Sequence, residues 1–172
     1  MMNSRDRPEV EGGRPLVPPN SDSRYVFLVA CVAHKANAPR PARNLYISPW
    51  FRMAATLAER NSNAWFILSA KHGLLPPDKV IPPYNKTLSL MTRQERRTWA
   101  EQVLQNLGIV LKNADVVVFL AGLMYRYDLV RTLRERGHTV QVPMEGLRIG
   151  EQLAWLKRNL AGAESWPWNA WL

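Results

Sequence analysis

Cysteine and histidine are scarce in this sequence. Cys31 is the only cysteine among 172 residues, and there are three histidines. A single cysteine excludes an internal disulfide, and scattered histidines lack the paired spacing of zinc sites. We therefore expect no metal centre, and a reducing, cytoplasmic location is the simplest interpretation.

Long apolar runs and glycine-rich phosphate-binding motifs are also missing. No apolar run approaches the roughly 20 residues that span a bilayer, and the first residues are polar, unlike those of a signal peptide. Neither a Walker loop nor a Rossmann glycine pattern is present. The sequence therefore predicts neither a membrane partner nor a bound nucleotide cofactor.

Acidic residues are outnumbered by basic ones. The 14 Asp and Glu residues face 23 Lys and Arg residues, which gives a net charge of +9. Such an excess favours polyanionic partners, with DNA foremost. A hydrophobic content of 47% is sufficient for one buried core. We expect a flexible leader at 1–23, one domain at 24–160 and a Trp-rich tail at 161–172, and we infer no obligatory protein partner.

Apolar, β-rich runs alternate with helical patterns along the domain. Strands are expected at residues 25–31, 65–68, 115–121 and 138–142. Helices are expected at 49–60, 92–111, 126–136 and 149–160. Residues 73–90 contain four prolines and are interpreted as a long, stiff loop without regular structure. The alternation predicts an α/β fold, as a three-layer α/β/α domain with a mostly parallel sheet of about four strands.

Polar residues follow the expected strands, and in parallel sheets ligands bind at the carboxyl ends of the strands. The most informative end is the stretch from Ser69 to Gly73, where a buried strand changes abruptly into Ser-Ala-Lys-His-Gly. A half-buried lysine can hold negative charge or act as a nucleophile, and a histidine can move protons near neutral pH. Lys71 and His72 are therefore the leading catalytic candidates. A snorkelling lysine beside a turn-capping histidine would give the same pattern.

Two carboxylates could complete such a site. Asp78 and Glu145 could position a water molecule or stabilise a cationic, oxocarbenium-like sugar. Each could instead form an ion pair with a nearby Arg or Lys. A nucleophilic Cys31 paired with a histidine is a weaker alternative, because no third orienting residue is visible.

Other residues near the strand ends are candidates for contacts with substrate and DNA. Cations neutralise phosphates, and aromatic rings stack on unpaired bases. The substrate-binding candidates are Cys31, His34, Tyr46, Ser48, Ser69, Tyr84 and Tyr125. The DNA-phosphate candidates are Arg40, Arg43, Lys79, Lys86, Arg93, Arg97 and Arg148. The competing interpretation is a solvated basic surface with aromatic residues in the core.

The stretch LSAKHGL at 68–74 resembles the motif of a family of small bacterial and phage proteins. The resemblance covers about residues 26–156 and includes RxLYxSPxF at 43–51, Pro83-Tyr84, and GxxIGxQLxW at 146–155. This family is distantly similar to YaaA-type proteins, which bind DNA and are linked to oxidative DNA damage. Its α/β/α plan is similar to that of uracil-DNA glycosylases, although their water-activating and His-Pro-Ser motifs are not recognisable here.

The resemblance implies a DNA glycosylase that flips a modified base, for example a glucosylated hydroxymethylcytosine of phage DNA, and hydrolyses its N-glycosidic bond in antiviral defence. In this hypothesis Lys71 and His72 hold or protonate the departing base, and Asp78 or Glu145 positions water. Two alternatives remain open: a noncatalytic DNA-binding or damage-response protein, and an enzyme that acts on free nucleosides.

Overall fold

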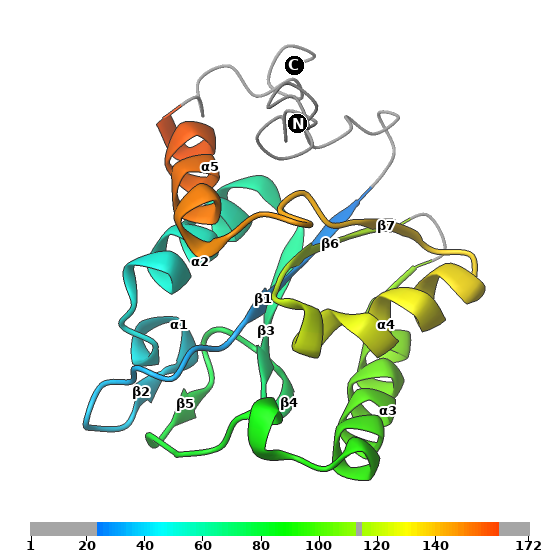
Figure 1. Ribbon diagram of the computed structural model, residues 1–172, viewed down its shortest axis with the longest axis horizontal. Coiled ribbons are helices and arrows are strands. Elements are labelled where there is room, and N and C mark those ends of the chain that lie inside the picture. Colours follow the sequence, from blue (N-terminus) through cyan, green and yellow to red (C-terminus); the bar gives the residue numbers. More distant parts are fainter. Residues whose placement is uncertain (1–23, 113–114, 162–172) are drawn as a thin grey trace, which may run out of the picture.

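The computed structural model describes residues 24–112 and 115–161. The expected leader at 1–23 and residues 162–172 of the expected Trp-rich tail lie outside this part of the chain. The described residues form a five-stranded sheet in the order β4-β3-β1-β6-β7 (Figure 1). No helix in the described part of the chain is long and apolar enough to cross a membrane.

The central strand of the sheet is β1 (Tyr25–Ala30), which is buried along its whole length. It pairs in parallel with β3 (Ala64–Ser69) on one side and with β6 (Val116–Leu120) on the other. β7 (Thr139–Gln141) extends the sheet in parallel beside β6. Strands that are covered on both faces become continuous apolar runs, which is why these segments could be found in the sequence.

Helices cover both faces of this sheet (Figure 1). α2 (Pro49–Asn61) and α5 (Ile149–Ala161) pack against each other on one face. α3 (Arg93–Val110) and α4 (Leu123–Glu135) pack against each other on the opposite face. The predicted α/β fold is therefore confirmed, with helices on both sides of a mostly parallel sheet.

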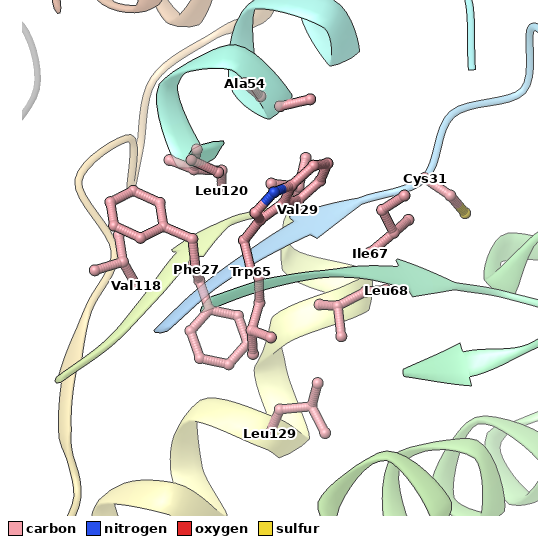
Figure 2. Packing of buried hydrophobic residues seen from close by; sticks show 14 of the residues in the cluster. Phe27, Val29, Cys31, Ala54, Trp65, Ile67, Leu68, Val118, Leu120 and Leu129 are labelled. Atoms are coloured by element: carbon pink, nitrogen blue, oxygen red, sulfur yellow. The ribbon is translucent and has the colours of Figure 1, made fainter. Parts of the chain in front are cut away.

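The core lies between the sheet and these two helical layers. Figure 2 shows Ala54 of α2 on one side of the strands and Leu129 of α4 on the other, and both side chains are fully buried. Trp65 on β3 and Phe27 on β1 occupy paired positions in the parallel register. The side chains of alternate strand residues thus supply both layers of the core.

The expectation of an irregular loop over 73–90 was wrong in part. β4 (Gly73–Leu75) turns back antiparallel along β3, and it makes the sheet five-stranded instead of about four-stranded. β5 (Val80–Ile81) pairs with β2 (Arg40–Pro41), which leads into the short helix α1 (Ala42–Leu45). Residues Leu88–Leu90 form a 3-10 turn, η1. These short elements are defined by partners distant in the sequence, and their own residues carry too little periodicity to reveal them.

The helix starts follow from local capping. The Ser48 hydroxyl accepts a hydrogen bond from the Phe51 backbone N–H at 3.1 Å, and Pro49 occupies the first turn of α2. Thr92 and Glu95 form the expected capping box of α3. α4 begins at Leu123, three residues before the predicted start, because Gly122, two residues after the end of β6, takes the extended N-cap conformation. Its first turn therefore lies at the carboxyl edge of the sheet.

The connections place a topological switch point between β1 and β6. The chain leaves β1 for α2 and returns at β3, whereas it leaves β6 for α4 and returns at β7. The two crossovers run to opposite sides and opposite faces of the sheet. In open α/β sheets such a switch point, at the carboxyl ends of the strands, is where ligands bind.

Candidate functional site

A chain of three hydroxyl groups lies beside this carboxyl edge, with Tyr84 in its middle. The Tyr84 hydroxyl lies 2.8 Å from that of Tyr46 and 2.7 Å from that of Ser69. Ser69 is the last residue of β3 and is fully buried, as is Tyr46. The proline-rich segment after β5 therefore returns one aromatic side chain to the end of β3.

The Ser69 hydroxyl also shapes the turn that carries the two leading catalytic candidates. It accepts hydrogen bonds from the backbone N–H groups of His72 at 3.0 Å and Lys71 at 3.3 Å. Because both lone pairs are then occupied, the Ser69 proton is donated to Tyr84, and Tyr84 in turn donates to Tyr46. This order explains why a serine ends the strand: its side chain holds the turn and orients a phenol.

Two lysine ammonium groups lie near the Tyr84 ring. The Nζ atom of Lys35 lies 4.3 Å from the ring centroid, and that of Lys71 lies 5.7 Å from it. Lys35 donates hydrogen bonds to the backbone carbonyls of Val32 and Ala33, at 3.1 and 3.3 Å. Burial lowers the pKa of Lys35, while the nearby Cys31 acts in the opposite direction. Cations at these distances are attracted by the negative face of an aromatic ring.

His72 completes the group of side chains around Tyr84. Its ring meets the Tyr84 ring edge-on, with centroids 5.3 Å apart. Burial lowers the pKa of His72, and the charges of Lys71 and Lys79 lower it further. The Nε2 atom is buried and has no hydrogen-bond partner among the described residues. We call these six residues the Tyr84 cluster: Lys35, Tyr46, Ser69, Lys71, His72 and Tyr84.

The phenols of this region are neutral donors at physiological pH. Burial raises the pKa of Tyr46 to about 12, although the hydrogen bond from Tyr84 opposes the shift. Burial also raises the pKa of Tyr84 and of Tyr125 above the ordinary value for tyrosine. The Tyr84 cluster thus contains two ammonium groups and neutral polar side chains, and its six residues include no carboxylate.

Cys31 and Tyr125 meet at the switch point of the sheet. The Sγ atom of Cys31, directly after β1, lies 3.3 Å from the Tyr125 hydroxyl in α4. The Tyr125 ring packs edge-on against Trp99, whose indole N–H donates to the Ser69 carbonyl at 2.9 Å. Trp99 therefore links the switch point of the sheet to the turn of the Tyr84 cluster. Cys31 is buried, and its contacts are those of a small core residue.

A cleft of about 290 Å³ opens beside Lys71, between the turn and α3. Its volume is just below the range for small-molecule sites, roughly 300–1,000 Å³. We call it the α3 cleft. Its lining includes Lys71, Lys86, Met91, Gln94, Trp99 and Gln102.

The structure gives both predicted carboxylates arginine partners. Asp78 lies 2.7 Å from Nη2 of Arg43, and Glu145 lies 3.0 Å from Nη1 of Arg126. Asp78 is 80% exposed, and Arg43 also pairs with Glu59. These contacts match the interpretation in which both carboxylates form ion pairs. The partner of Asp78, Arg43, lies in α1. Glu145 does follow β7 at the carboxyl edge, but its partner is on α4.

The other predicted residues divide between distinct places. Ser48 caps α2, and His34 is exposed and accepts a backbone hydrogen bond from Ile47 through its carbonyl. Lys79 is near His72, since its charge lowers the pKa of that ring. Arg93 and Arg97 are exposed on α3, and Arg148 is exposed just before α5. Arg40 and Arg43 line a second cleft, to which Tyr46 also contributes.

Two contributors to the site were not assigned a role from the sequence. They are Lys35, which follows β1, and Trp99, which lies in α3. The Lys35 ammonium group lies over the ring of Tyr84, a residue 49 positions further along the chain. No local pattern in the sequence indicates this contact. Trp99 had one available signal, since a buried indole N–H usually needs a partner.

Comparison with known proteins places this chain in a family. Residues 26–158 match the model of DUF6884, a family of unknown function. The chain belongs to the DUF6884 family. The match includes every residue of the Tyr84 cluster. A Bacillus subtilis (strain 168) protein, "Uncharacterized protein YfjM", is 30% identical over 128 residues, which cover 70% of this chain and 80% of that protein. No solved structure matches the chain.

Proposed function

We propose that this DUF6884 protein is a DNA N-glycosylase that binds an extruded, modified base at the Tyr84 cluster and hydrolyses its N-glycosidic bond. The observation that carries the proposal is the gathering of two ammonium groups and a histidine with a lowered pKa around one phenol. The position of this group, at the carboxyl edge of a parallel sheet, is where such folds bind ligands.

The chemistry of this group suits activation of the leaving base. When the bond between the sugar C1′ and the base nitrogen breaks, its electron pair moves onto the base, and a water oxygen then bonds to C1′ while a water proton goes to the base. Cations and neutral N–H or O–H donors stabilise the negative charge that develops on the base. Lys71 supplies the charge, and His72, neutral because its pKa is lowered, acts as a donor.

The ion pairs of the two predicted carboxylates agree with a site that acts mainly on the leaving base. Asp78 pairs with Arg43 and Glu145 pairs with Arg126, so each carboxylate has an arginine partner in this arrangement. The protein therefore contributes mainly on the leaving-group side, and water attacks a sugar that has already gained cationic character. A bulky base such as glucosylated hydroxymethylcytosine would extend into the α3 cleft, whose lining includes Gln94 and Gln102 as hydrogen-bonding groups.

Base release is the direct test of this function. The full chain is incubated with matched duplexes that carry cytosine, hydroxymethylcytosine or glucosylated hydroxymethylcytosine, and free base and abasic sites are measured. We expect release from one modified duplex and a loss of about a hundredfold or more in Lys71→Ala, a typical effect for a group that stabilises developing charge. Lys157→Ala, a change on the exposed face of α5, is the matched control and should retain full activity. Equal rates in the two variants would reject the assignment of Lys71.

A second candidate function is noncatalytic DNA binding, and the ion pairs of Asp78 and Glu145 are the observation in its favour. A binding protein needs cations for phosphates but no carboxylate to activate water. No base release from any duplex, together with binding to all of them that weakens steeply with salt, would select this reading. Tight binding of a free nucleoside with negligible affinity for duplexes would select a nucleoside enzyme instead.

A further inference from the structure

A second cleft is lined in part by Tyr46, which also belongs to the Tyr84 cluster. It has a volume of about 400 Å³, and its lining residues include members of β2, α1 and α2. Three arginines contribute to its lining, Arg40, Arg43 and Arg52, together with Glu59 as the acidic side chain. We call it the arginine cleft. Its side chains take no part in the hydroxyl chain of the Tyr84 cluster, apart from Tyr46, which borders both.

The arginines in this cleft are not equivalent. Arg43 is a structural clamp, because its guanidinium pairs with Glu59 and Asp78 and lies over the Trp65 ring, 5.9 Å from the centroid. Arg40 and Arg52 enter none of the ion pairs formed within residues 24–112 and 115–161. Two guanidinium groups thus line a cavity without an acidic partner, which leaves their charge available to a ligand.

Buried nitrogen atoms point to the same conclusion. The Nε atoms of Arg40 and Arg43 are both buried and have no hydrogen-bond partner within the described residues. A buried N–H group without an acceptor is unfavourable, and native proteins rarely retain one that nothing satisfies. The cleft therefore has an excess of donors and positive charge over its acceptors, among which Glu59 is the one carboxylate in the described lining.

We propose that the arginine cleft is a phosphate-binding site, separate from the Tyr84 cluster and independent of base excision. The planar guanidinium fork matches the geometry of two phosphate oxygens, which is why arginine is favoured wherever phosphate is recognised in a bidentate manner. Arg40 and Arg52 bind the phosphate oxygens, and Arg43 holds the wall of the cleft in place. Glu59 limits the affinity, because its carboxylate faces the same cavity.

The phosphate could belong to the backbone of a nucleic acid or to a terminal phosphate monoester. Both sources present the same tetrahedral group of anionic oxygens, so the lining residues alone recognise them equally. A position beside Tyr46 means that a strand held here would lie next to the Tyr84 cluster. The two sources are separated by experiment.

The test is calorimetric titration of the full chain with inorganic phosphate, followed by short oligothymidylates with and without a 5′-phosphate. We expect the double variant Arg40→Gln/Arg52→Gln to weaken phosphate binding about tenfold or more, since each change removes a charge-assisted hydrogen bond. Arg134→Gln removes an exposed charge at the end of α4 and is the matched control, with unchanged affinity expected.

Glu59→Gln gives a gain that misfolding cannot imitate. Removal of this carboxylate takes a like charge away from the bound phosphate and frees Arg43, so affinity should rise roughly two- to fivefold. If only the 5′-phosphorylated oligomer needs Arg40 and Arg52 for binding, the site recognises a terminal phosphate. If both oligomers need these arginines equally, the site recognises the backbone. Any of three results would overturn the proposal: no binding of phosphate, the same phosphate affinity in the double variant and in Arg134→Gln, or weaker phosphate binding by Glu59→Gln. These results are independent of base release, so the two proposals stand or fall separately.

Discussion

The hydroxyl groups of Tyr84 and Tyr46 lie 2.8 Å apart, although the two residues are 38 positions apart in the sequence. Tyr46 is fully buried between α1 and α2, whereas Tyr84 is partly exposed and lies near two lysines. The buried phenol thus fixes the position of the accessible one. This contact joins the proline-rich segment to the core and gives the candidate site a rigid base.

Tyr84→Phe should therefore affect stability and function together. The change removes the acceptor of the Ser69 proton and the donor to Tyr46, which should cost about 1–2 kcal/mol of the free energy of unfolding. Urea denaturation measures this loss, and base release or nucleic-acid binding should fall as well. Tyr127→Phe is the control, because Tyr127 is 60% exposed, and it should be close to neutral. Equal stability of the two variants would contradict the described hydroxyl chain.

Acid sensitivity should depend on His72. Burial, followed by the charges of Lys71 and Lys79, lowers its pKa below the ordinary value of 6.5, so the unfolded chain takes up this proton at a higher pH than the folded one. The folded state then keeps this stability above pH 6.5 and loses it as the pH falls through the interval between the two pKa values. His72→Gln should flatten that part of the stability profile, measured by denaturation at successive pH values. Lys79→Gln should flatten this part of the profile to a smaller extent, because it removes one of the two positive charges that lower the pKa of His72. A steeper stability profile in either variant would be evidence against a lowered pKa at His72.

Gly73 and Gly108 offer a matched pair of alanine substitutions. Gly73 closes the turn after His72 with φ at +66°, a left-handed conformation, so Gly73→Ala should cost about 1–2 kcal/mol and disturb Lys71 and His72. Gly108 lies within α3 with open space around the added Cβ, so Gly108→Ala should stabilise the protein by about 0.5–1 kcal/mol. The shift in the urea midpoint measures both effects. Opposite signs are expected, and a stabilising Gly73→Ala would show that the turn is not as described.

The sequence predicted the elements whose own residues define them. β1 and β6 are continuous apolar runs, and α2 and α3 begin at recognisable caps, so these were found with boundaries within a residue or two. β4 and β5 were missed because each exists through pairing with a partner strand, and a run of two or three residues carries no period. Elements of this second kind depend on the tertiary fold.

The same distinction applies to the candidate site. The stretch from Ser69 to His72 was identified because its polarity changes abruptly at a strand end, and that signal is local. The roles of Lys35 and Tyr84 depend on a contact across 49 positions, and the ion pairs of Asp78 and Glu145 depend on arginines on other elements. For both carboxylates the sequence left catalysis and ion pairing open, because the partner is set by the fold and not by the neighbouring residues.

Arg24 and Asp115 form the ion pair on which acid stability should depend most. The Asp115 side chain is 2% exposed and lies 2.6 Å from the Nη2 atom of Arg24, which also donates to the Val110 carbonyl at 2.7 Å. Burial alone would raise the pKa of Asp115, but the hydrogen bonds from Arg24 and the Lys112 backbone N–H outweigh it, and the pKa is lowered. Because the folded pKa lies below the unfolded value of 3.8, this stabilisation is fully present above pH 3.8 and is lost as the pH falls through the folded pKa.

Asp115→Asn should therefore destabilise the protein at neutral pH and remove part of its acid transition. We expect a loss of about 1–3 kcal/mol, below the full cost of a deeply buried unpaired charge, because the Arg24 side chain is 30% exposed and water can solvate it. Asp128→Asn is the control: Asp128 is 44% exposed and lies 3.9 Å from Arg131, so its loss should be below roughly 0.5 kcal/mol. Urea denaturation at pH 7 and at pH 3 checks both claims. The difference in free energy of unfolding between wild type and Asp115→Asn should shrink at the lower pH, because protonation removes the same charge that the substitution removes. A difference that stays constant would mean that Asp115 acts through packing and not through its charge.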